Sequence, residues 1–255
     1  MGLPSVVIVF RHCEKLSECS HNQKFPECCE KGNSPPNSCD DCSPEGYKRA
    51  AGLDVSMNNL LEKIHAGPLT AIYAAGYKDI DSKCSMSRRM WELVVPMSKT
   101  TGLKIDTKWC ANDVQEVAQD IVSNNSNGYV AVSWEHTVIP ELVGWLMAYG
   151  GNIKASGPVT KGIPQKWQGD VFDQYWIIDF RGKSAAFSIQ PESILPGDCP
   201  TARSSNGKCP GTKEGFTAML RHESHHPEWC WWAKVGWLVL FIVMLCMLYR
   251  DWVKS

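Results

Sequence analysis

The sequence lacks an excess of charge of either sign. Its 255 residues carry 26 lysines and arginines against 27 aspartates and glutamates, which gives a formal net charge of −1. No overall basic field would attract nucleic acid, so we expect no nucleic-acid partner, and no strong acidity indicates a solvating tail. Because 44% of the residues are hydrophobic and 21% are charged, the chain can build a sizeable core, and wholesale disorder is not expected.

The sequence also lacks an internal repeat and the features of a signal peptide. Residues 1–5, Met-Gly-Leu-Pro-Ser, contain no basic n-region and lead into no long apolar h-region with a cleavage site. We therefore expect no secretory signal.

Long uncharged apolar runs are rare, with one exception near the C-terminus. Residues 235–249 carry no charge, and they are flanked by tryptophans that resemble an aromatic belt. A helix over residues 231–252 would measure roughly 33 Å, enough for a hydrocarbon core of roughly 30 Å. We expect one transmembrane helix here. Residues 228–255 would then be a tail anchor, and residues 1–227 would form one domain in the cytosol of a membrane-bound protein.

Strands and helices alternate through that domain. Apolar β-branched runs predict strands, and apolar residues at helical spacing predict helices. The alternation predicts a three-layer α/β/α sandwich with a mostly parallel central sheet. Residues 16–45, rich in Cys, Pro, Asn and Ser, are predicted to form an inserted loop. The predicted strands are 6–10, 70–75, 128–134, 173–180 and 184–190, and the predicted helices are 46–65, 87–102, 113–124 and 139–151.

Arginines and histidines stand at the ends of predicted strands and at the start of a predicted helix. Arg11 and His12 end the first strand, Arg88 and Arg89 open a helix, and His136 follows a central strand. Ligands of open α/β sheets bind at the carboxyl ends of the strands. Guanidinium groups match phosphate oxygens, and a histidine held among them can attack phosphorus. The pattern therefore predicts a pocket for a phosphorylated substrate.

Four segments in this order resemble the histidine phosphatase superfamily, also called phosphoglycerate-mutase-like. Arg11-His12-Cys13-Glu14 is similar to its Arg-His-Gly-Glu motif. Cys42–Leu53, "CSPEGYKRAAGL", is similar to its Leu-Ser-Pro-x-Gly-x-x-Arg-Ala segment, and Ser87–Pro96 to its Ser-x-Arg-x-x-x-Thr-x-x-Pro segment. His136 stands in a Trp-Glu-His form of the later strand end. The resemblance covers about residues 5–190.

The resemblance implies a phosphomonoesterase that works through a phosphohistidine and requires no cofactor. His12 would be the nucleophile, and Arg11, Arg89 and His136 would grip the phosphoryl oxygens. Arg89 is preferred to Arg88 because it stands four residues before Leu93, where the family usually has Thr.

Two departures from the pattern bear on catalysis. Cys13 replaces the usual glycine, which would cost stability if the position needs a positive φ or a close backbone approach. The acid that should protonate the leaving oxygen has no clear place. Glu135 is our candidate, and the other acids near the motifs are Glu14, Asp79 and Asp81. The alternative hypothesis is a catalytically weak or inactive phosphate-binding interaction module on a membrane.

Cysteines are plentiful, with 12 in the chain. Cys28, Cys29, Cys39 and Cys42 could hold a structural zinc ion, and in the cytosol metal is expected before disulfides. Reduced thiols in a loop are the alternative. Cys199 and Cys209 bracket a short segment that a disulfide would close if the domain were lumenal, and Asn124-Asn125-Ser126 is a glycosylation sequon. If disulfides form, the expected topology is reversed.

Overall fold

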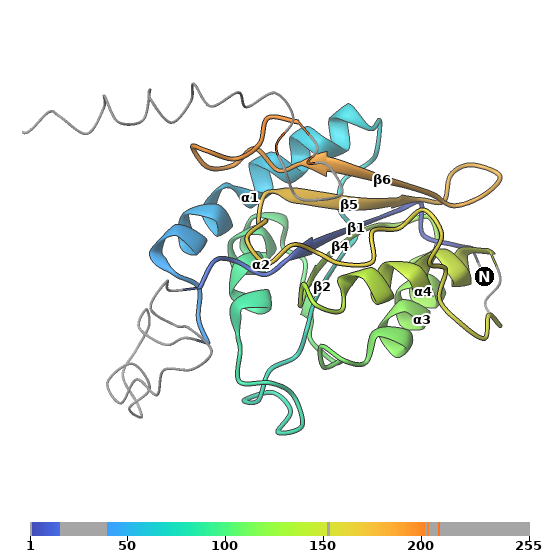
Figure 1. Cartoon of the computed structure of the whole chain (residues 1–255), viewed down its shortest axis with the longest axis horizontal. Coiled ribbons are helices and arrows are strands. Elements are labelled where there is room, and N and C mark those ends of the chain that lie inside the picture. The colour runs from blue at the N-terminus through green and yellow to red at the C-terminus, as the bar shows by residue number, and fades with distance from the viewer. Residues whose placement is uncertain (1, 16–39, 152–153, 202, 204–208, 210–255) are drawn as a thin grey trace, which may run out of the picture. The chain divides into compact units, whose positions relative to one another are not determined.

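The computed structural model describes residues 2–15, 40–151, 154–201, 203 and 209. They form a mixed α/β fold with a six-stranded sheet in the order β3-β2-β4-β1-β5-β6 (Figure 1). Strands β3, β2, β4 and β1 run parallel, and β5 lies antiparallel to both β1 and β6. The strands are β1 (Val6–Arg11), β2 (Ala71–Ala74), β3 (Ile105–Asp106), β4 (Tyr129–Trp134), β5 (Gln174–Asp179) and β6 (Ala186–Pro191).

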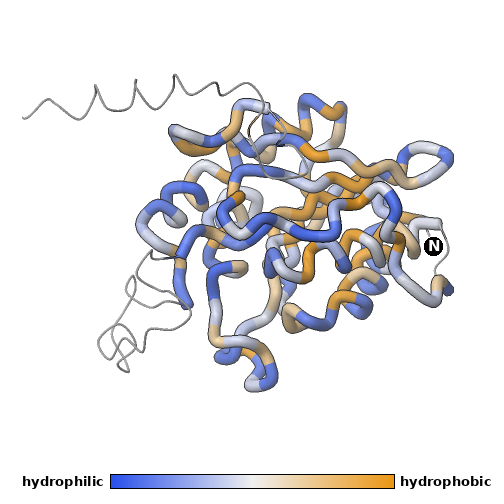
Figure 2. Tube along the Cα trace, in the orientation of Figure 1, coloured by the Kyte–Doolittle hydropathy of each residue, from blue (hydrophilic) through white to orange (hydrophobic). Residues whose placement is uncertain are grey.

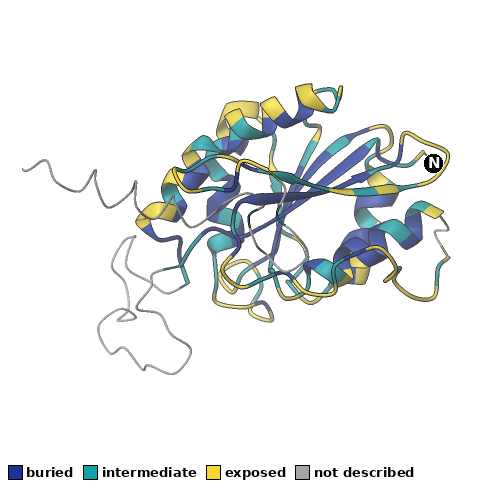
Figure 3. Cartoon of the chain, turned by 45° about the horizontal axis from the view of Figure 1, so that its top comes forward, coloured by how far each residue is buried: buried dark blue, intermediate teal, exposed yellow. Residues whose placement is uncertain are grey.

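Four helices cover the sheet: α1 (Pro44–Lys63), α2 (Arg89–Thr101), α3 (Val114–Asn124) and α4 (Ile139–Gly151). They pack in pairs, α1 against α2 and α3 against α4. The chain steps one way along the sheet through α1 and α2 and back through α3 and α4. Because parallel crossovers are right-handed, α3 lies on the opposite face from α1 and α2, and α4 packs against α3 on that face (Figure 3).

The centre of the sheet forms the core. Residues Val6–Phe10 are 0% exposed. A strand covered on both faces reads as a continuous apolar run, as this one does. Hydrophobic residues gather along the central strands, and the burial of those strands contrasts with the exposed outer sides of the helices (Figures 2 and 3).

Helix α1 begins at Pro44, two residues before the predicted start at Gly46 and within the last two residues of the predicted insertion. Ser43 caps it by accepting a hydrogen bond from the Gly46 amide at 3.1 Å, and Pro44 occupies the first turn, where its missing N–H costs nothing. The apolar stripe of Ala50, Leu53 and Met57 is buried. The cap fixes the backbone at Ser43, where the chain enters α1.

The predicted strands and helices are confirmed within a few residues at each end. The sequence did not predict strand β3, because a strand of two residues is too short to show an apolar pattern. The described part of the chain contains no helix long and apolar enough to cross a membrane. The predicted anchor, residues 231–252, and residues 16–39 of the predicted insertion lie outside the described residues.

Candidate active site

The sheet register brings two histidines together. Strands β1 and β4 are neighbours and parallel, and Arg11 is paired with Trp134 at their ends. The residues that follow, His12 on one side and Glu135 and His136 on the other, therefore leave the same edge side by side. The His12 and His136 rings lie 5.2 Å apart between centroids.

The hydrogen bonds of His12 define its tautomer. Its Nδ1 lies 2.8 Å from the carbonyl oxygen of Cys13, which can only accept, so Nδ1 carries the proton. Its Nε2 is left with a lone pair, 3.2 Å from His136 Nδ1 and 3.5 Å from a Glu135 oxygen. Burial, together with the charges of Arg89 and Arg11, lowers the pKa of His12 to about 4 against an opposing effect of Glu135. His12 is therefore neutral near pH 7 and offers Nε2 as a nucleophile.

Arg11 is locked in place beside His12. Its Nη1 donates to the carbonyl oxygens of Gln168, Gly169 and Val171 at 3.2, 2.9 and 2.9 Å. The guanidinium carbon stacks 3.7 Å from the centroid of the Phe172 ring. Its Nε is buried and has no partner among the described residues. Burial lowers the pKa of Arg11 to about 9, so the side chain still carries its charge at neutral pH.

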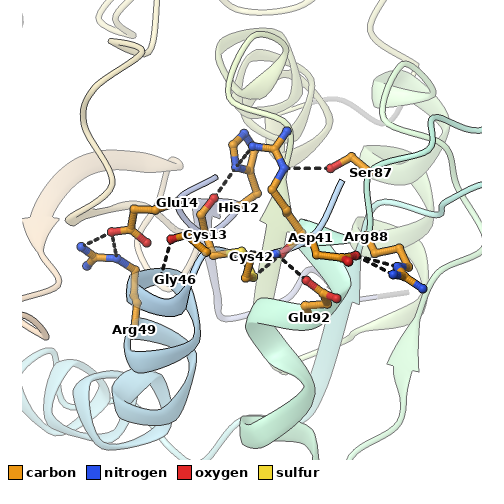
Figure 4. Close-up of a disulfide and its surroundings, with 12 residues drawn as sticks. His12, Cys13, Glu14, Asp41, Cys42, Gly46, Arg49, Ser87, Arg88 and Glu92 are labelled. Atoms are coloured by element: carbon orange, nitrogen blue, oxygen red, sulfur yellow. Dashed lines mark hydrogen bonds and ion pairs between the residues drawn. A yellow bond between two sulfur atoms is a disulfide. The ribbon is translucent and has the colours of Figure 1, made fainter. Parts of the chain in front are cut away.

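The two consecutive arginines before α2 point to different partners. Arg89 Nη1 lies 3.3 Å from His12 Nδ1, and Arg89 Nε donates to Ser87 Oγ at 3.0 Å. Arg88 instead forms an ion pair with Asp41 at 2.7 Å. Burial lowers the pKa of Arg89, whereas the hydrogen bond that Arg88 donates to Asp41 raises the pKa of Arg88. The structure thus brings Arg89 to His12, whereas Arg88 lies against Asp41 (Figure 4).

Glu135 bridges the histidines. One carboxylate oxygen lies 2.6 Å from His136 Nδ1 and the other 3.5 Å from His12 Nε2. Burial alone would raise the pKa of Glu135, but its contacts with the two histidines outweigh this effect and hold the pKa far below its usual range. With His12 neutral, the hydrogen bond that His136 Nδ1 donates at 2.6 Å is the one that remains. In the free site Glu135 is a carboxylate. It can orient His136 or accept a proton, but it has no proton to donate.

The other acids named from the sequence point elsewhere. Glu14 is bound by Arg49, with its carboxylate 2.7 Å from Nη2, and Arg49 also binds Glu192 and Asp198 at 3.1 and 2.9 Å. This buried cluster ties the segment after His12 to the segment after β6.

Asp79 and Asp81 lie in the loop after β2. The Asp79 side chain is 73% exposed, and Asp81 accepts a hydrogen bond from the Lys83 amide. Of the four acids, Glu135 is the one that contacts His12.

His12, Glu135 and His136 are close enough together to hold a metal ion. The positive charges of Arg11 and Arg89 converge on the same place and oppose a cation. The arrangement instead suits an anion with several oxygens, such as a phosphoryl group.

The cysteine prediction is corrected in part. Cys42 forms a disulfide with Cys13, so it has no thiolate for the predicted zinc site. Cys28, Cys29 and Cys39 lie outside the described residues. The described residues form two further disulfides, Cys84–Cys110 and Cys199–Cys209. Cys13 is not among the residues with a positive φ, so it is not strained where the resembling motif has glycine.

Sequence patterns missed the wall formed by residues 168–172. Its carbonyl groups anchor Arg11, and the Phe172 ring lies 6.1 Å from the His12 ring. Backbone acceptors in a loop leave no trace in residue type, so no sequence signal could have identified them. A pocket of about 810 Å³ opens beside this wall, lined by Glu14, Lys15, Ser43, Pro44, Glu45, Lys48, Gly169, Phe172, Leu195 and Pro196.

Comparisons with known proteins leave the family open. No family model matches the chain, and no curated protein is significantly similar to it. Among solved structures, the chain is similar to a putative phosphohistidine phosphatase, SixA, from Nakamurella multipartitia. The identity is 11% and the TM-score 0.40, and the match covers 75% of this chain and 98% of that one. A likeness of this size carries no inference about activity.

Proposed function

We propose that the chain is a phosphatase that hydrolyses a phosphomonoester through a phosphohistidine on His12. The observation that carries the proposal is the state of His12. Its Nδ1–H is held by the Cys13 carbonyl group, its Nε2 keeps a lone pair 3.2 Å from His136 Nδ1, and the charges of Arg89 and Arg11 act on the ring. The resemblance of four ordered segments to the histidine phosphatase superfamily supports the same assignment.

The site can perform the first step as follows. The substrate phosphoryl group lies between Arg11, Arg89 and His136, and the unpaired Arg11 Nε gains an acceptor. The His12 Nε2 lone pair attacks phosphorus, and the bond from phosphorus to the leaving oxygen breaks. The arginines stabilise the charge on the equatorial oxygens, which is the main contribution that a protein makes to phosphoryl transfer.

In the second step water attacks the phosphohistidine. Glu135, an ionised carboxylate 3.5 Å from Nε2, is placed to accept the proton of that water, and His12 is released with its lone pair restored. Because Glu135 has no proton to give in the free site, the first step favours substrates whose leaving group needs little protonation, such as aryl phosphates.

The substrate is a phosphorylated small molecule or a phosphoprotein. The pocket beside Phe172 would receive the part of the substrate beyond the phosphate. Its lining mixes the apolar residues Phe172 and Leu195 with the charged residues Lys15 and Lys48.

Membrane attachment through residues 231–252 belongs to the same proposal and rests on their apolar run. The cytosolic orientation stays a prediction. The three disulfides among the described residues support the alternative orientation, in which the domain faces an oxidising compartment, because structural disulfides are rare in the cytosol.

The second candidate function is a phosphate-binding module with little or no catalysis. The ionised state of Glu135 favours it, since this carboxylate, which lies 3.5 Å from His12 Nε2, has no proton to give to a leaving oxygen. Such a module would bind inorganic phosphate through the same arginines.

The test is phosphate release by the full chain from an aryl phosphate and a panel of biological monoesters. The chain is compared with His12→Ala and with His65→Ala, a change at an exposed histidine after α1. We expect activity in the wild type and in His65→Ala, and its loss in His12→Ala. Acid-labile, base-stable phosphate should be trapped on His12. A folded wild-type chain that binds phosphate but turns over none of the substrates would favour the binding module.

A further inference from the structure

A disulfide lies directly behind the proposed nucleophile. Cys13 follows His12 in the chain, and Cys42 precedes Ser43, the cap of α1. Cys13 and Cys42 are 0% and 1% exposed. The bond therefore joins the end of β1 to the start of α1 inside the protein (Figure 4).

The same disulfide packs against the start of α2. Cys13 Sγ and Cys42 Sγ lie 3.5 and 3.8 Å from the carbonyl oxygen of Arg89. These are packing contacts, because sulfur atoms in a disulfide carry no hydrogen. The Cys42 amide donates to Glu92, one turn further along α2, at 2.7 Å.

Two groups of the site depend on this junction. The Cys13 carbonyl oxygen holds the Nδ1–H of His12 at 2.8 Å and thereby selects the tautomer whose Nε2 is unprotonated. The backbone of Arg89, whose guanidinium lies 3.3 Å from the same imidazole, rests on both sulfur atoms. One covalent bond thus connects the supports of the nucleophile and of one phosphate clamp.

The junction has little room to relax. A methyl group added at Gly46 would lie 2.9 Å from Cys13 Cβ and from the Glu14 carbonyl oxygen, and 3.1 Å from Cys42 Cβ. Two unbonded sulfur atoms sit roughly 1.5 Å further apart than a bonded pair. Opening the disulfide would therefore push on Gly46 or on the Arg89 carbonyl. A displacement of about 1 Å in a catalytic group can cost about 100-fold in rate.

We propose that Cys13 and Cys42 are positioning residues of the phosphate site, whose disulfide must be intact for full activity and whose reduction by a dithiol inactivates the chain. The inference rests on the proposed function. In the reduction, one thiolate of the dithiol attacks a sulfur atom of the pair and forms a mixed disulfide. Its second thiol then displaces the protein. Two electrons and two protons pass to Cys13 and Cys42, and the dithiol becomes a cyclic disulfide.

The test compares two double variants of the full chain, Cys13→Ala with Cys42→Ala and Cys84→Ala with Cys110→Ala. The second pair is a matched control, since the sequence separations of the two disulfides are 29 and 26 residues. The entropy that each bond removes from the unfolded chain is therefore nearly equal. We expect kcat/KM to fall between about 10-fold and 100-fold in the first variant and less than about 3-fold in the control.

A pH profile separates positioning from a general loss of stability. Loosening the junction exposes His12, so the acid limb of kcat/KM should move upward in pH in the first variant and stay in place in the control. Thermal unfolding of both variants shows whether each is folded at the assay temperature. If the first variant fails to fold, dithiothreitol treatment of the wild type replaces it. Mass spectrometry of alkylated thiols then reports which bond has opened, and activity should fall with the opening of Cys13–Cys42.

Equal kcat/KM values and equal acid limbs in the two variants would overturn the inference, and so would full activity after Cys13–Cys42 has opened. Binding of inorganic phosphate, measured by calorimetry, keeps the two proposals distinguishable. If the wild type binds phosphate but hydrolyses no substrate, the phosphatase is refuted. The positioning role is still supported if the wild type binds phosphate more tightly than the first variant and no more tightly than the control. A wild type that neither binds phosphate nor hydrolyses substrates refutes both.

Discussion

Replacing His12 by Asn should make the folded chain more resistant to acid. The imidazole is 1% exposed, and burial holds its pKa at about 4, below the ordinary 6.5. The unfolded chain therefore binds a proton at this residue more readily than the folded one, and stability falls as the pH drops from 6.5 to 4. From pH 7, the loss is about 2 kcal/mol at pH 5 and about 3 kcal/mol at pH 4. Asn removes this loss, and its amide can still donate to the Cys13 carbonyl group.

The measurement is urea unfolding of the full chain at pH 7, 6 and 5, followed by the fluorescence of its 11 tryptophans. Relative to the wild type, the midpoint of His12→Asn should rise by roughly 1 M between pH 7 and pH 5. Phe10→Leu, a change in the core beside Tyr175, is the control that lowers stability without removing a titrating group. If the urea midpoints of the wild type and of His12→Asn change by the same amount between pH 7 and pH 5, His12 is not held neutral by burial.

Four further predictions follow from single contacts. Arg89→Ala should lower kcat/KM about 100-fold to 1000-fold, because it removes a donor to the phosphoryl oxygens, whereas Arg88→Ala, which breaks the pair with Asp41, should cost less than about 10-fold in the same assay. Gly46→Ala should lower the free energy of unfolding by about 1–3 kcal/mol, measured in urea, because its methyl group meets Cys13 and Glu14; an unchanged midpoint would contradict the close packing. Arg49→Met should cost about 3–5 kcal/mol by the same measurement, because it leaves the carboxylates of Glu14, Glu192 and Asp198 together without their cation. If the domain faces an oxidising compartment, exposed Asn124 should carry a glycan, seen as a mobility shift on enzymatic deglycosylation that Asn124→Gln abolishes; a chain from its native membrane without the shift would favour the cytosolic orientation.

The sequence was informative about the strand ends. The apolar runs before Arg11 and before Glu135 identify two buried strands, and parallel strands expose their carboxyl ends at one edge. The meeting of His12 with His136 therefore followed from local patterns plus one rule of topology. The choice between Arg88 and Arg89 agrees with where their side chains point, although it depended on motif spacing and not on physics.

Local sequence patterns could not predict the contacts that arise from tertiary packing. The pairing of Cys13 with Cys42 could not be deduced, because the spacing of cysteines does not determine their connectivity. The expected cytosolic location favoured a zinc site over disulfides, because disulfides are rare in the cytosol. The carbonyl groups that hold Arg11 and the ring of Phe172 belong to a loop more than 150 residues away in the chain, whose position depends on the finished sheet.

The central place of β1 has a consequence for the synthesis of the chain. Val6 pairs with Tyr129 on one side and with Asp179 on the other, so both neighbours of the first strand are made late. At about 5–20 residues per second, ribosomal elongation from Val6 to Asp179 takes roughly 10–35 s. Until β4 is made, both edges of this apolar strand are available for aggregation, and one edge stays available until β5 is made. Cys42 is available much sooner than either partner strand, so the nascent chain can fasten the end of β1 to α1 while the rest of the sheet is still being made.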